Sequence, residues 1–266
     1  MNNQLQIKEA SLKSILQSYG SLAVAFSGGV DSSLLLSLAH EVLADGALAI
    51  TACMAGLPTR ELAAAQEFCS QRGIRHVLVD FDEFAVDGFA ENPPHRCYLC
   101  KRKLLSLLQV TAREQGAAAL AEGSNLDDEF DYRPGKAAVE ELGVASPFIL
   151  AGFSKADIRA LSKERELPTW DKPAYACLST RLPYGTALSK ELLKQIDQAE
   201  EHVFNAGAKQ VRVRVHQNLA RIEVDPESIP LLSEPLTREH LVSKLQALGF
   251  TYITLDLQGY RLSAFL

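Results

Sequence analysis

A glycine- and serine-rich string, SGGVDSS at residues 27–33, carries the strongest chemical signal in the sequence. Gly28 and Gly29 permit backbone conformations that other residues avoid, so amide groups there can approach a bound anion closely. A helix that begins at this point directs its free N–H groups toward the same anion. Further donors are the hydroxyl groups of Ser27, Ser32 and Ser33. The string therefore predicts a cradle for a phosphate chain.

The string differs from the GxxxxGK(S/T) type of phosphate loop because no lysine follows its glycines. Its carboxylate, Asp31, would repel a phosphate chain unless a cation such as Mg²⁺ lay between them. Alternatively, Asp31 could orient the loop through hydrogen bonds. A tight turn in which Ser and Asp side chains only cap a helix is the simpler interpretation, but the complete string at a strand–helix junction favours nucleotide binding.

Three cysteines lie where a thiol could be activated or could bind a metal. Cys97 and Cys100 form a CxxC pair at the start of a predicted helix, and Cys177 lies in an irregular, proline-flanked segment. Thiol pKa values fall at helix N-termini, so the pair could bind metal or cycle as a disulfide. One pair is weak evidence for zinc, whereas three thiolates match a 4Fe-4S cluster with one open iron. The alternative is that they are small buried residues, as we expect for Cys53 and Cys69.

A second loop of polar residues, EGSNLDDE at 122–129, follows a predicted strand and should lie along the same sheet edge as the phosphate loop. Gly123 would permit close approach to a nucleotide. Asp127, Asp128 or Glu129 could hold Mg²⁺ through carboxylate oxygens. A surface loop of turn-forming residues is the alternative for each acid.

Two arginines are predicted to share one face of a strand near the end of the chain. Arg212 and Arg214 stand two residues apart in VRVRV at 211–215, so their side chains point the same way. Two guanidinium groups on one face suit the phosphate of a mononucleotide. A solvated outer strand face, with Arg221 and Glu223 pairing on it, is the alternative.

The first 150 residues alternate between apolar runs and amphipathic helical patterns. The runs have the length of buried parallel strands and cover residues 22–26, 48–52, 76–80 and 117–121. The helical patterns cover 33–43, 59–72, with Thr59 as N-cap, and 98–115. This alternation predicts an α/β fold with a doubly wound parallel sheet. Ligands in such folds bind at the carboxyl ends of the strands.

The pattern changes in the last third of the chain. Ser154 and Asp157 form a capping signature for a helix that Pro168 should end, and 168–186 show no clear period. A helix at 189–205, strands at 211–215 and 220–224, a helix at 237–248 and a strand at 252–257 follow. Clean alternation in the first two strands predicts one buried face. We expect a nucleotide-binding domain at 1–186 and a small α+β domain at 187–266 for substrate binding or oligomerisation.

Composition excludes several classes of protein. The 266 residues carry 27 Lys+Arg and 33 Asp+Glu, a formal net charge of −6, which argues against a nucleic-acid backbone as the main partner. No apolar run approaches the roughly 20 residues of a membrane helix, so we expect no membrane partner. The N-terminal residues do not match a secretory signal, and five cysteines indicate reduced thiols. We expect a cytoplasmic protein.

Taken together, these strings resemble those of a known family. The string at 27–33 resembles the pyrophosphatase loop (SGGxDS) of the ATP-pyrophosphatase, or PP-loop, superfamily. RCYLCKRKL, EGSNLDDE with YRPG, KPAYACLSTRLPYGT and VRVRVH follow in the order found in LarE-type ATP-dependent sulfur transferases. The similarity runs from about residue 16 to the last strand.

The resemblance implies an enzyme that uses ATP and Mg²⁺ to adenylate a carboxylate of pyridinium-3,5-biscarboxylic acid mononucleotide and then converts it to a thiocarboxylate, in nickel-pincer nucleotide biosynthesis. Asp31 and Cys177 would be the catalytic residues. In family members with one such cysteine, the residue at the position of Cys177 gives up its own sulfur and becomes dehydroalanine. This chain also carries Cys97 and Cys100, so we expect the cluster-dependent variant, in which the open iron holds an exogenous sulfide.

Two other functions are compatible with parts of the sequence. A tRNA thiolase, or another adenylating PP-loop enzyme, would use the same loop, but the acidic net charge counts against a nucleic-acid substrate. A non-catalytic nucleotide- or metal-binding module would need neither Asp31 nor the Cys177 segment. We therefore expect a small-molecule mononucleotide as the partner, and a homo-oligomer.

Overall fold

A computed structural model describes residues 3–129, 135–173 and 175–261 of the chain. Its contacts divide the chain into two compact units, Met1–Asp82 with His95–Tyr175 and Glu83–Pro94 with Ala176–Leu266. The first unit ends at Tyr175, eleven residues before the expected boundary at 186. The expected domains at 1–186 and 187–266 stay a prediction, because this division does not test them. In the described part of the chain, no helix combines the length and apolarity needed to cross a bilayer.

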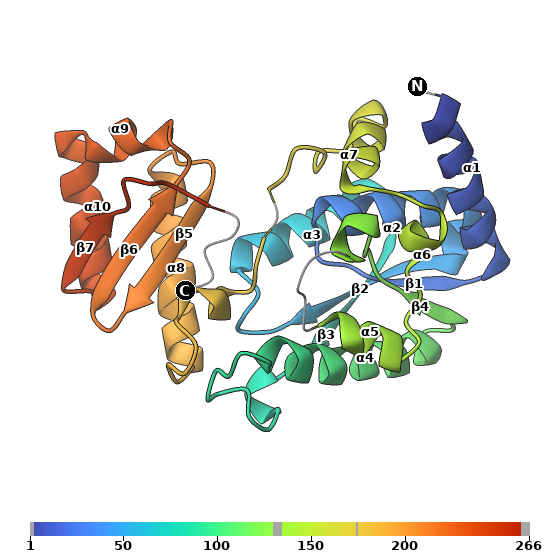
Figure 1. Cartoon of the computed structure of the whole chain (residues 1–266), viewed down its shortest axis with the longest axis horizontal. Coiled ribbons are helices and arrows are strands. Elements are labelled where there is room, and N and C mark those ends of the chain that lie inside the picture. Colours follow the sequence, from blue (N-terminus) through green and yellow to red (C-terminus); the bar gives the residue numbers. More distant parts are fainter. Residues whose placement is uncertain (1–2, 130–134, 174, 262–266) are drawn as a thin grey trace. The chain divides into compact units, whose positions relative to one another are not determined.

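The first unit is built on a parallel sheet (Figure 1). Its strands are β1 (Leu22–Ala25), β2 (Ala47–Cys53), β3 (Arg75–Asp80) and β4 (Ala119–Ala121), in the order β3-β2-β1-β4. The chain therefore adds strands on one side of β1 and then crosses to the other side. Loops after β1 and β4 leave the sheet at this reversal point, where ligands bind in such folds.

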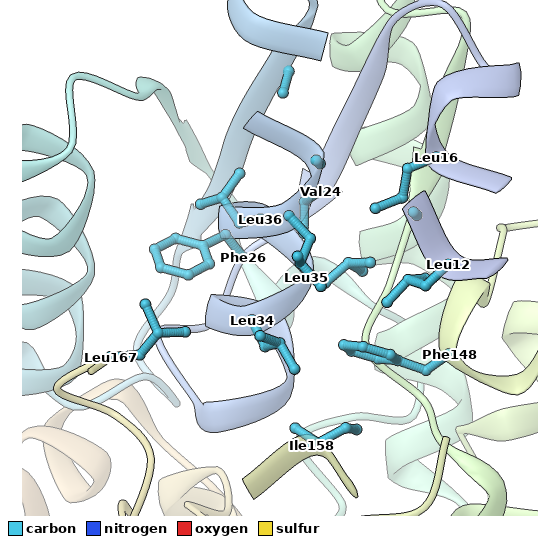
Figure 2. Close-up of a cluster of buried hydrophobic side chains, with 14 of the residues drawn as sticks. Leu12, Leu16, Val24, Phe26, Leu34, Leu35, Leu36, Phe148, Ile158 and Leu167 are labelled. Carbon is cyan, nitrogen blue, oxygen red and sulfur yellow. The ribbon is translucent and has the colours of Figure 1, made fainter. Parts of the chain in front are cut away.

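Helices cover both faces of this sheet, which confirms the predicted doubly wound α/β fold. The helices and short 3₁₀ turns of the unit are α1 (Asn3–Ser18), α2 (Val30–Leu43), η1 (Ala44–Gly46), α3 (Thr59–Gln71), α4 (Arg96–Glu114), η3 (Leu126–Glu129), α5 (Lys136–Glu141), α6 (Pro147–Leu150) and α7 (Lys155–Glu164). Alternate residues of β1 belong to different cores: Leu22 and Val24 pack with α1 and α2, whereas Ala23 packs with α4. Figure 2 shows the first core, where Leu12 and Phe148 point toward Leu34 and Leu35 of α2.

Several helix boundaries differ from the sequence predictions. Pro58, not Thr59, is the N-cap of α3. The capping box of Ser154 and Asp157 is confirmed at the start of α7. That helix ends at Glu164, before Pro168, because the chain turns with a positive φ of 52° at Glu166. Proline is therefore not what terminates the helix.

The second unit is a small α+β fold, as predicted. Its elements are η2 (Glu83–Ala85), η4 (Leu178–Arg181), α8 (Lys190–Asn205), β5 (Val211–His216), β6 (Leu219–Val224), α9 (Ser228–Ser233), α10 (Pro235–Ala247) and β7 (Tyr252–Leu255). The strand order is β5-β6-β7, with β5 antiparallel and β7 parallel to β6. The prediction of one buried face was wrong for β5, because every residue of Val211 to Val215 is buried.

Candidate active site

The glycine-rich string forms the junction between β1 and α2, as predicted. Gly28 has a φ of +69°, and a Cβ added there would lie 3.3 Å from the Ala65 Cβ of α3. Any side chain at Gly28 would therefore combine backbone strain with a tight contact. Gly29 is the N-cap of α2 and has no side-chain acceptor to offer the helix. The first N–H groups of α2 thus face the loop without a side-chain cap, an arrangement that suits an anion.

The serine hydroxyl groups of the loop contact one another. The Ser32 Oγ lies 3.1 Å from the Ser27 Oγ, donates to the Gly29 carbonyl over 3.3 Å and accepts from the Ser27 N–H over 3.3 Å. Ser33 is fully buried, and within the described residues its Oγ has no hydrogen-bond partner. Buried hydroxyl groups without a partner are rare in proteins. The loop therefore fits a ligand that brings acceptor oxygens, such as a polyphosphate.

The residue before the loop is fixed by the neighbouring strands. The Thr51 hydroxyl of β2 donates to the Phe26 carbonyl over 2.7 Å, and the His76 Nε2 of β3 lies 2.8 Å from the same hydroxyl. Because the Thr51 proton is used, His76 must donate from Nε2. Burial lowers the pKa of His76, which favours this neutral form. The loop therefore begins from a rigid point on the sheet.

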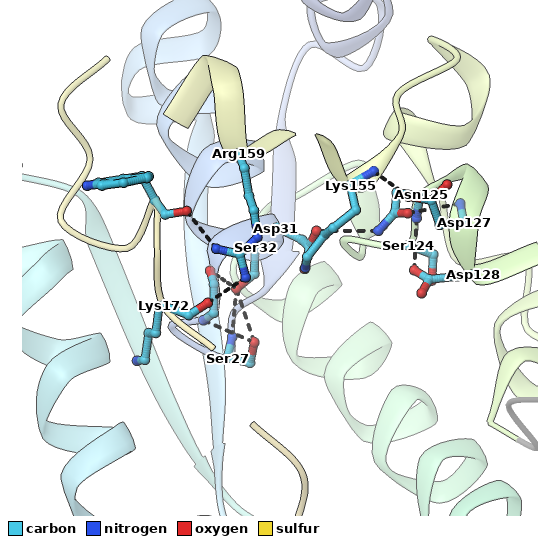
Figure 3. Close-up of polar contacts among 12 residues, drawn as sticks. Ser27, Asp31, Ser32, Ser124, Asn125, Asp127, Asp128, Lys155, Arg159 and Lys172 are labelled. Atoms are coloured by element: carbon cyan, nitrogen blue, oxygen red, sulfur yellow. Dashed lines mark hydrogen bonds and ion pairs between the residues drawn. The ribbon is translucent and has the colours of Figure 1, made fainter. Parts of the chain in front are cut away.

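Asp31 is engaged by two residues from later in the chain (Figure 3). The Lys155 Nζ, at the start of α7, lies 2.5 Å from the Asp31 Oδ2, and the Asn125 Nδ2 donates to the Oδ1 over 3.4 Å. Both charged side chains keep a quarter or more of their surface exposed. These contacts are compatible with the role of Asp31 in orienting the loop through hydrogen bonds, which stays a prediction. Its role as a Mg²⁺ ligand stays a prediction.

The loop after β4 lies against the same helix start. A Cβ at Gly123 would lie 3.0 Å from the Asp31 Cβ and 3.2 Å from the Ser32 N. The close contact between this loop and the start of α2 thus requires glycine at position 123. The neighbour seen in the structure is the start of α2 itself, whereas the sequence predicted a nucleotide there. Asp128 is 9% exposed and accepts from the Asn125 N–H over 3.0 Å.

Asp127 accepts from the Lys155 N–H over 2.8 Å, so it joins this loop to the start of α7. Mg²⁺ binding by Asp128 and Glu129 stays a prediction, and the Glu129 side chain lies outside the described residues. Most of the YRPG string also falls outside them, at 130–134.

Two lysines that no local sequence pattern identified, Lys155 and Lys172, lie at the phosphate loop. The Lys172 Nζ donates to the Gly28 carbonyl over 3.0 Å and lies 2.7 Å from the Glu61 Oε2. Arg159 holds this segment through hydrogen bonds to the Trp170 and Lys172 carbonyls, both of 2.9 Å. Together with Lys155, Lys172 brings positive charge to a loop that has no lysine of its own. Both lysines stand inside strings that the sequence singled out, but nothing local assigns them this role.

The CxxC pair lies in the first unit, at the start of α4. Arg96 is the first residue of this helix, so Cys97 and Cys100 occupy its first turn and a half, as predicted. Both cysteines are half-buried. Within the described residues, no group of three His, Cys, Asp or Glu side chains is gathered as a metal site requires. Cys177 belongs to the second unit, and a cluster shared by the three thiols stays a prediction.

Cys177 lies in a short segment whose conformation is defined by its neighbours. It is the N-cap of η4, and its Sγ lies 3.4 Å from the Ser179 Oγ. The thiol is half-buried, whereas the Arg181 side chain four residues later is almost fully buried against Glu200. Burial alone would lower the pKa of Arg181, but the Glu200 carboxylate outweighs it and raises that pKa. Arg181 is therefore a fixed cation beside this segment.

The two remaining cysteines are poor nucleophiles. Cys69 is 1% exposed, as core packing predicts, and burial raises its pKa to about 12. Cys53 is half-buried at the end of β2 rather than in the core. Burial and the Asp80 carboxylate raise its pKa. A thiolate is the reactive form of cysteine, so neither residue suits sulfur transfer.

The predicted arginine pair is buried, so the alternative of a solvated strand face was wrong. Arg212 and Arg214 are 7% and 6% exposed. The Arg214 Nε lies 2.6 Å from the Glu223 Oε1, which also accepts from the Arg221 Nη2 over 3.1 Å, so Arg214 already has a carboxylate partner.

Among the described residues, no carboxylate forms an ion pair with Arg212. It donates to the Arg261 carbonyl over 3.2 Å, and its guanidinium lies 4.4 Å from the Tyr260 ring centre. Burial lowers its pKa, and within the described residues its Nε has no hydrogen-bond partner. Of the two arginines, Arg212 is therefore the one whose guanidinium has a donor that could bind a phosphate.

Comparison with known proteins agrees with this geometry. The asparagine synthase family matches residues 7–97, which include β1, the phosphate loop and α2. An uncharacterized protein from Synechocystis sp. is 43% identical over 256 residues, 95% of this chain and 96% of its own length. The pyridinium-3,5-bisthiocarboxylic acid mononucleotide synthase of Lactiplantibacillus plantarum is 37% identical over 259 residues, 97% of this chain and 93% of its own length. A tRNA-specific 2-thiouridylase from Rickettsia felis is 30% identical, but over only 57% of this chain.

A parallel sheet with an SGGVDSS loop between its first strand and the following helix defines an enzyme of the PP-loop class, which uses ATP and Mg²⁺. Within that class, the similarity to the Lactiplantibacillus plantarum synthase extends over almost the whole length of both proteins, so it identifies the family. The chain belongs to the family of the pyridinium-3,5-bisthiocarboxylic acid mononucleotide synthases, the LarE-type sulfur transferases. The predicted resemblance is thereby confirmed.

Proposed function

We propose that the chain adenylates a carboxylate of pyridinium-3,5-biscarboxylic acid mononucleotide with ATP and converts it to a thiocarboxylate. The observation that carries this proposal is the 37% identity to the Lactiplantibacillus plantarum synthase across both units. The phosphate loop between β1 and α2 supports the first half-reaction. The Cys177 segment supports the second.

In the first half-reaction, a carboxylate oxygen of the substrate attacks the α-phosphorus of ATP. The bond from that phosphorus to the α,β-bridging oxygen breaks, and pyrophosphate leaves. The N–H groups at the start of α2 and the hydroxyl groups of Ser27 and Ser32 would bind the leaving pyrophosphate. Orthophosphate would not be a direct product.

Cations around the loop complete this site in our proposal. Asp31, with Asp128, would hold Mg²⁺, whose positive charge allows a carboxylate to face a phosphate chain. Lys155 would then be released from Asp31 and could contact a phosphate oxygen instead. Lys172, at the Gly28 carbonyl, supplies a second charge. The two lysines would thus replace the lysine that this loop lacks.

In the second half-reaction, a sulfur nucleophile attacks the acyl carbon of the adenylate, and AMP leaves with the bonding electron pair. In number and type, the three thiols of Cys97, Cys100 and Cys177 would match the ligands of a 4Fe-4S cluster with one open iron. When bound, such a cluster would hold an exogenous sulfide on its open iron, so each turnover would consume one sulfide from solution. The alternative donor is the Cys177 Sγ itself, which would leave dehydroalanine and serve once. Arg212 would bind the substrate phosphate in either case.

The experiment incubates the purified protein, after anaerobic reconstitution with iron and sulfide, with ATP, Mg²⁺, sulfide and the dicarboxylic mononucleotide. We expect pyrophosphate and AMP, together with a product in which sulfur replaces one carboxylate oxygen, detected by mass spectrometry. An unchanged mass of the protein after turnover supports the cluster, whereas loss of one H₂S at Cys177 supports the sacrificial route. Bulk tRNA is the control acceptor, and its thiolation in place of the mononucleotide would refute the proposal.

A further inference from the structure

An ion pair with almost no solvent exposure lies in the second unit beside the segment that carries Cys177. The side chains of Arg181 and Glu200 are 1% and 0% exposed. The Arg181 Nε donates to the Glu200 Oε1 over 2.8 Å, and the Nη2 donates to the Oε2 over 3.2 Å. Removing two charges from water costs much of the free energy that their attraction returns. Stability alone is therefore a weak explanation for this pair.

The third nitrogen of the same guanidinium holds the backbone around Cys177. The Arg181 Nη1 donates to the Ala176 carbonyl over 2.7 Å, to the Cys177 carbonyl over 3.3 Å and to the Thr180 Oγ1 over 3.0 Å. A guanidinium is planar and presents its donors in a fixed fork. Because Glu200 fixes one edge of that fork, the other edge fixes the carbonyl groups on both sides of the sulfur-bearing residue.

Contacts to regular elements anchor this arrangement. The Glu200 Oε1 of α8 also accepts from the Val213 N–H of β5 over 3.0 Å, and the Arg214 Nη1 of β5 donates to the Thr180 carbonyl over 3.2 Å. The Cys177 segment itself contains only the four-residue η4. Its own backbone hydrogen bonds are few, such as the one from the Thr180 N–H to the Cys177 carbonyl over 2.9 Å, and side chains from α8 and β5 supply the further contacts that connect it to regular elements.

We propose that Arg181, anchored by Glu200, is a positioning residue that holds Cys177 in one conformation for sulfur transfer. A sulfur donor, or a ligand of one, must be kept in a near-attack geometry if it is to react efficiently with an activated carbonyl. The half-buried thiol is the accessible part of an otherwise fixed segment. Only the transfer step of this inference rests on the proposed function, because the ordering of the segment can be measured by itself.

The test compares Arg181→Met with the wild type in the full-length protein. Amide hydrogen exchange is measured for peptides covering 176–181 and for α8, and pyrophosphate release and thiocarboxylate formation are measured separately. Asp225→Ala is the matched control. Asp225 is a 9% exposed carboxylate of the same unit, and it accepts from the Lys209 N–H, the Gln210 N–H and the Ser228 hydroxyl.

In Arg181→Met we expect exchange to become about tenfold faster or more in 176–181 than in α8. Pyrophosphate release should stay within about twofold of the wild type while thiocarboxylate formation falls about tenfold or more. Arg181→Lys should be intermediate, because lysine keeps the charge but not the fork, and it decides the question if the methionine variant does not fold. In Asp225→Ala, pyrophosphate release and thiocarboxylate formation should change by the same factor.

Unchanged exchange in 176–181, or faster exchange spread evenly through the second unit as in a general destabilisation, would overturn the inference. Equal losses in the two half-reactions of Arg181→Met would also overturn it. If the wild type forms neither pyrophosphate nor thiocarboxylate, the proposed function fails. The exchange data would still decide whether Arg181 orders the segment.

Discussion

The phosphate loop and the Cys177 segment are held by ion pairs of opposite character. At the phosphate loop, the Asp31–Lys155 pair leaves its side chains 25% and 31% exposed. At the Cys177 segment, the Arg181–Glu200 pair is almost fully buried. Partly solvated pairs are weak and can exchange partners, whereas a buried pair resists separation because either charge alone would be uncompensated. The phosphate loop, which must admit a charged ligand, thus has an exchangeable ion pair, whereas the Cys177 segment, which must hold a reactive atom, has a fixed one.

The largest expected effects separate the two regions by half-reaction. Asp31→Ala should reduce pyrophosphate release on the order of 100-fold or more, because a carboxylate that places positive charge at the leaving group is lost. Cys177→Ala should abolish thiocarboxylate formation and leave pyrophosphate release within about twofold. A coupled pyrophosphate assay and mass spectrometry measure the two steps. If Cys177→Ala also stopped pyrophosphate release, the division of labour between the regions would be wrong.

Stability should distinguish the same two ion pairs. Glu200→Gln leaves the Arg181 charge buried without its partner, so we expect the free energy of unfolding to fall by about 3–5 kcal/mol. Lys155→Met removes a partly solvated partner of Asp31 and should change it by about 1 kcal/mol or less. Urea unfolding followed by circular dichroism checks both values. Equal losses of stability in Glu200→Gln and Lys155→Met would show that the two ion pairs do not differ in strength.

A smaller effect is expected on nucleotide affinity. Lys172→Met should weaken MgATP binding about tenfold, or about 1.4 kcal/mol, because a cation beside the phosphate loop is lost. Lys8→Met is the matched control: Lys8 and Lys172 are 22% and 21% exposed, and each lies 2.7 Å from a carboxylate. Lys8 pairs with Asp157 of α7. Isothermal titration calorimetry should show no change for it, and equal losses in the two variants would argue against a specific role for Lys172.

The smallest effect concerns acid stability of the first unit. Burial alone would raise the pKa of the Asp157 carboxyl, but the hydrogen bonds from Lys8 and Ser154 outweigh it and lower the pKa below its ordinary 3.8. A depressed carboxyl pKa contributes stability above the unfolded pKa and loses it as pH falls through the folded value. Asp157→Asn should therefore be less stable than wild type at pH 7, by about 1 kcal/mol or less at this partly exposed site.

The difference between Asp157→Asn and wild type should shrink as pH falls below about 4. Urea unfolding across this pH range measures it. A difference that stays constant with pH would show that the capping hydrogen bonds, rather than the charge, carry the effect.

Local patterns in the sequence predicted the sheet and the phosphate loop of the first unit, but not all of its helices. Apolar runs of strand length predicted the parallel sheet, and the string at 27–33 predicted where the phosphate loop lies. Both features depend on residues that are close in the sequence. The types of the side chains determine which strands are buried, and the glycines and the start of the helix determine the conformation of the loop. Helix α1 was missed, although Leu5, Leu12 and Leu16 have helical spacing, because Glu9 interrupts their apolar face.

What the sequence by itself determined, therefore, was the fold class, the family and the position of the phosphate loop. Only the tertiary structure decided which charges meet. Lys155 reaches Asp31 across 124 residues and Lys172 reaches Gly28 across 144, and burial of β5 on both faces placed its arginines inside the second unit. Pairing between distant residues depends on how strands are ordered and helices packed, and a local pattern carries no information about that order.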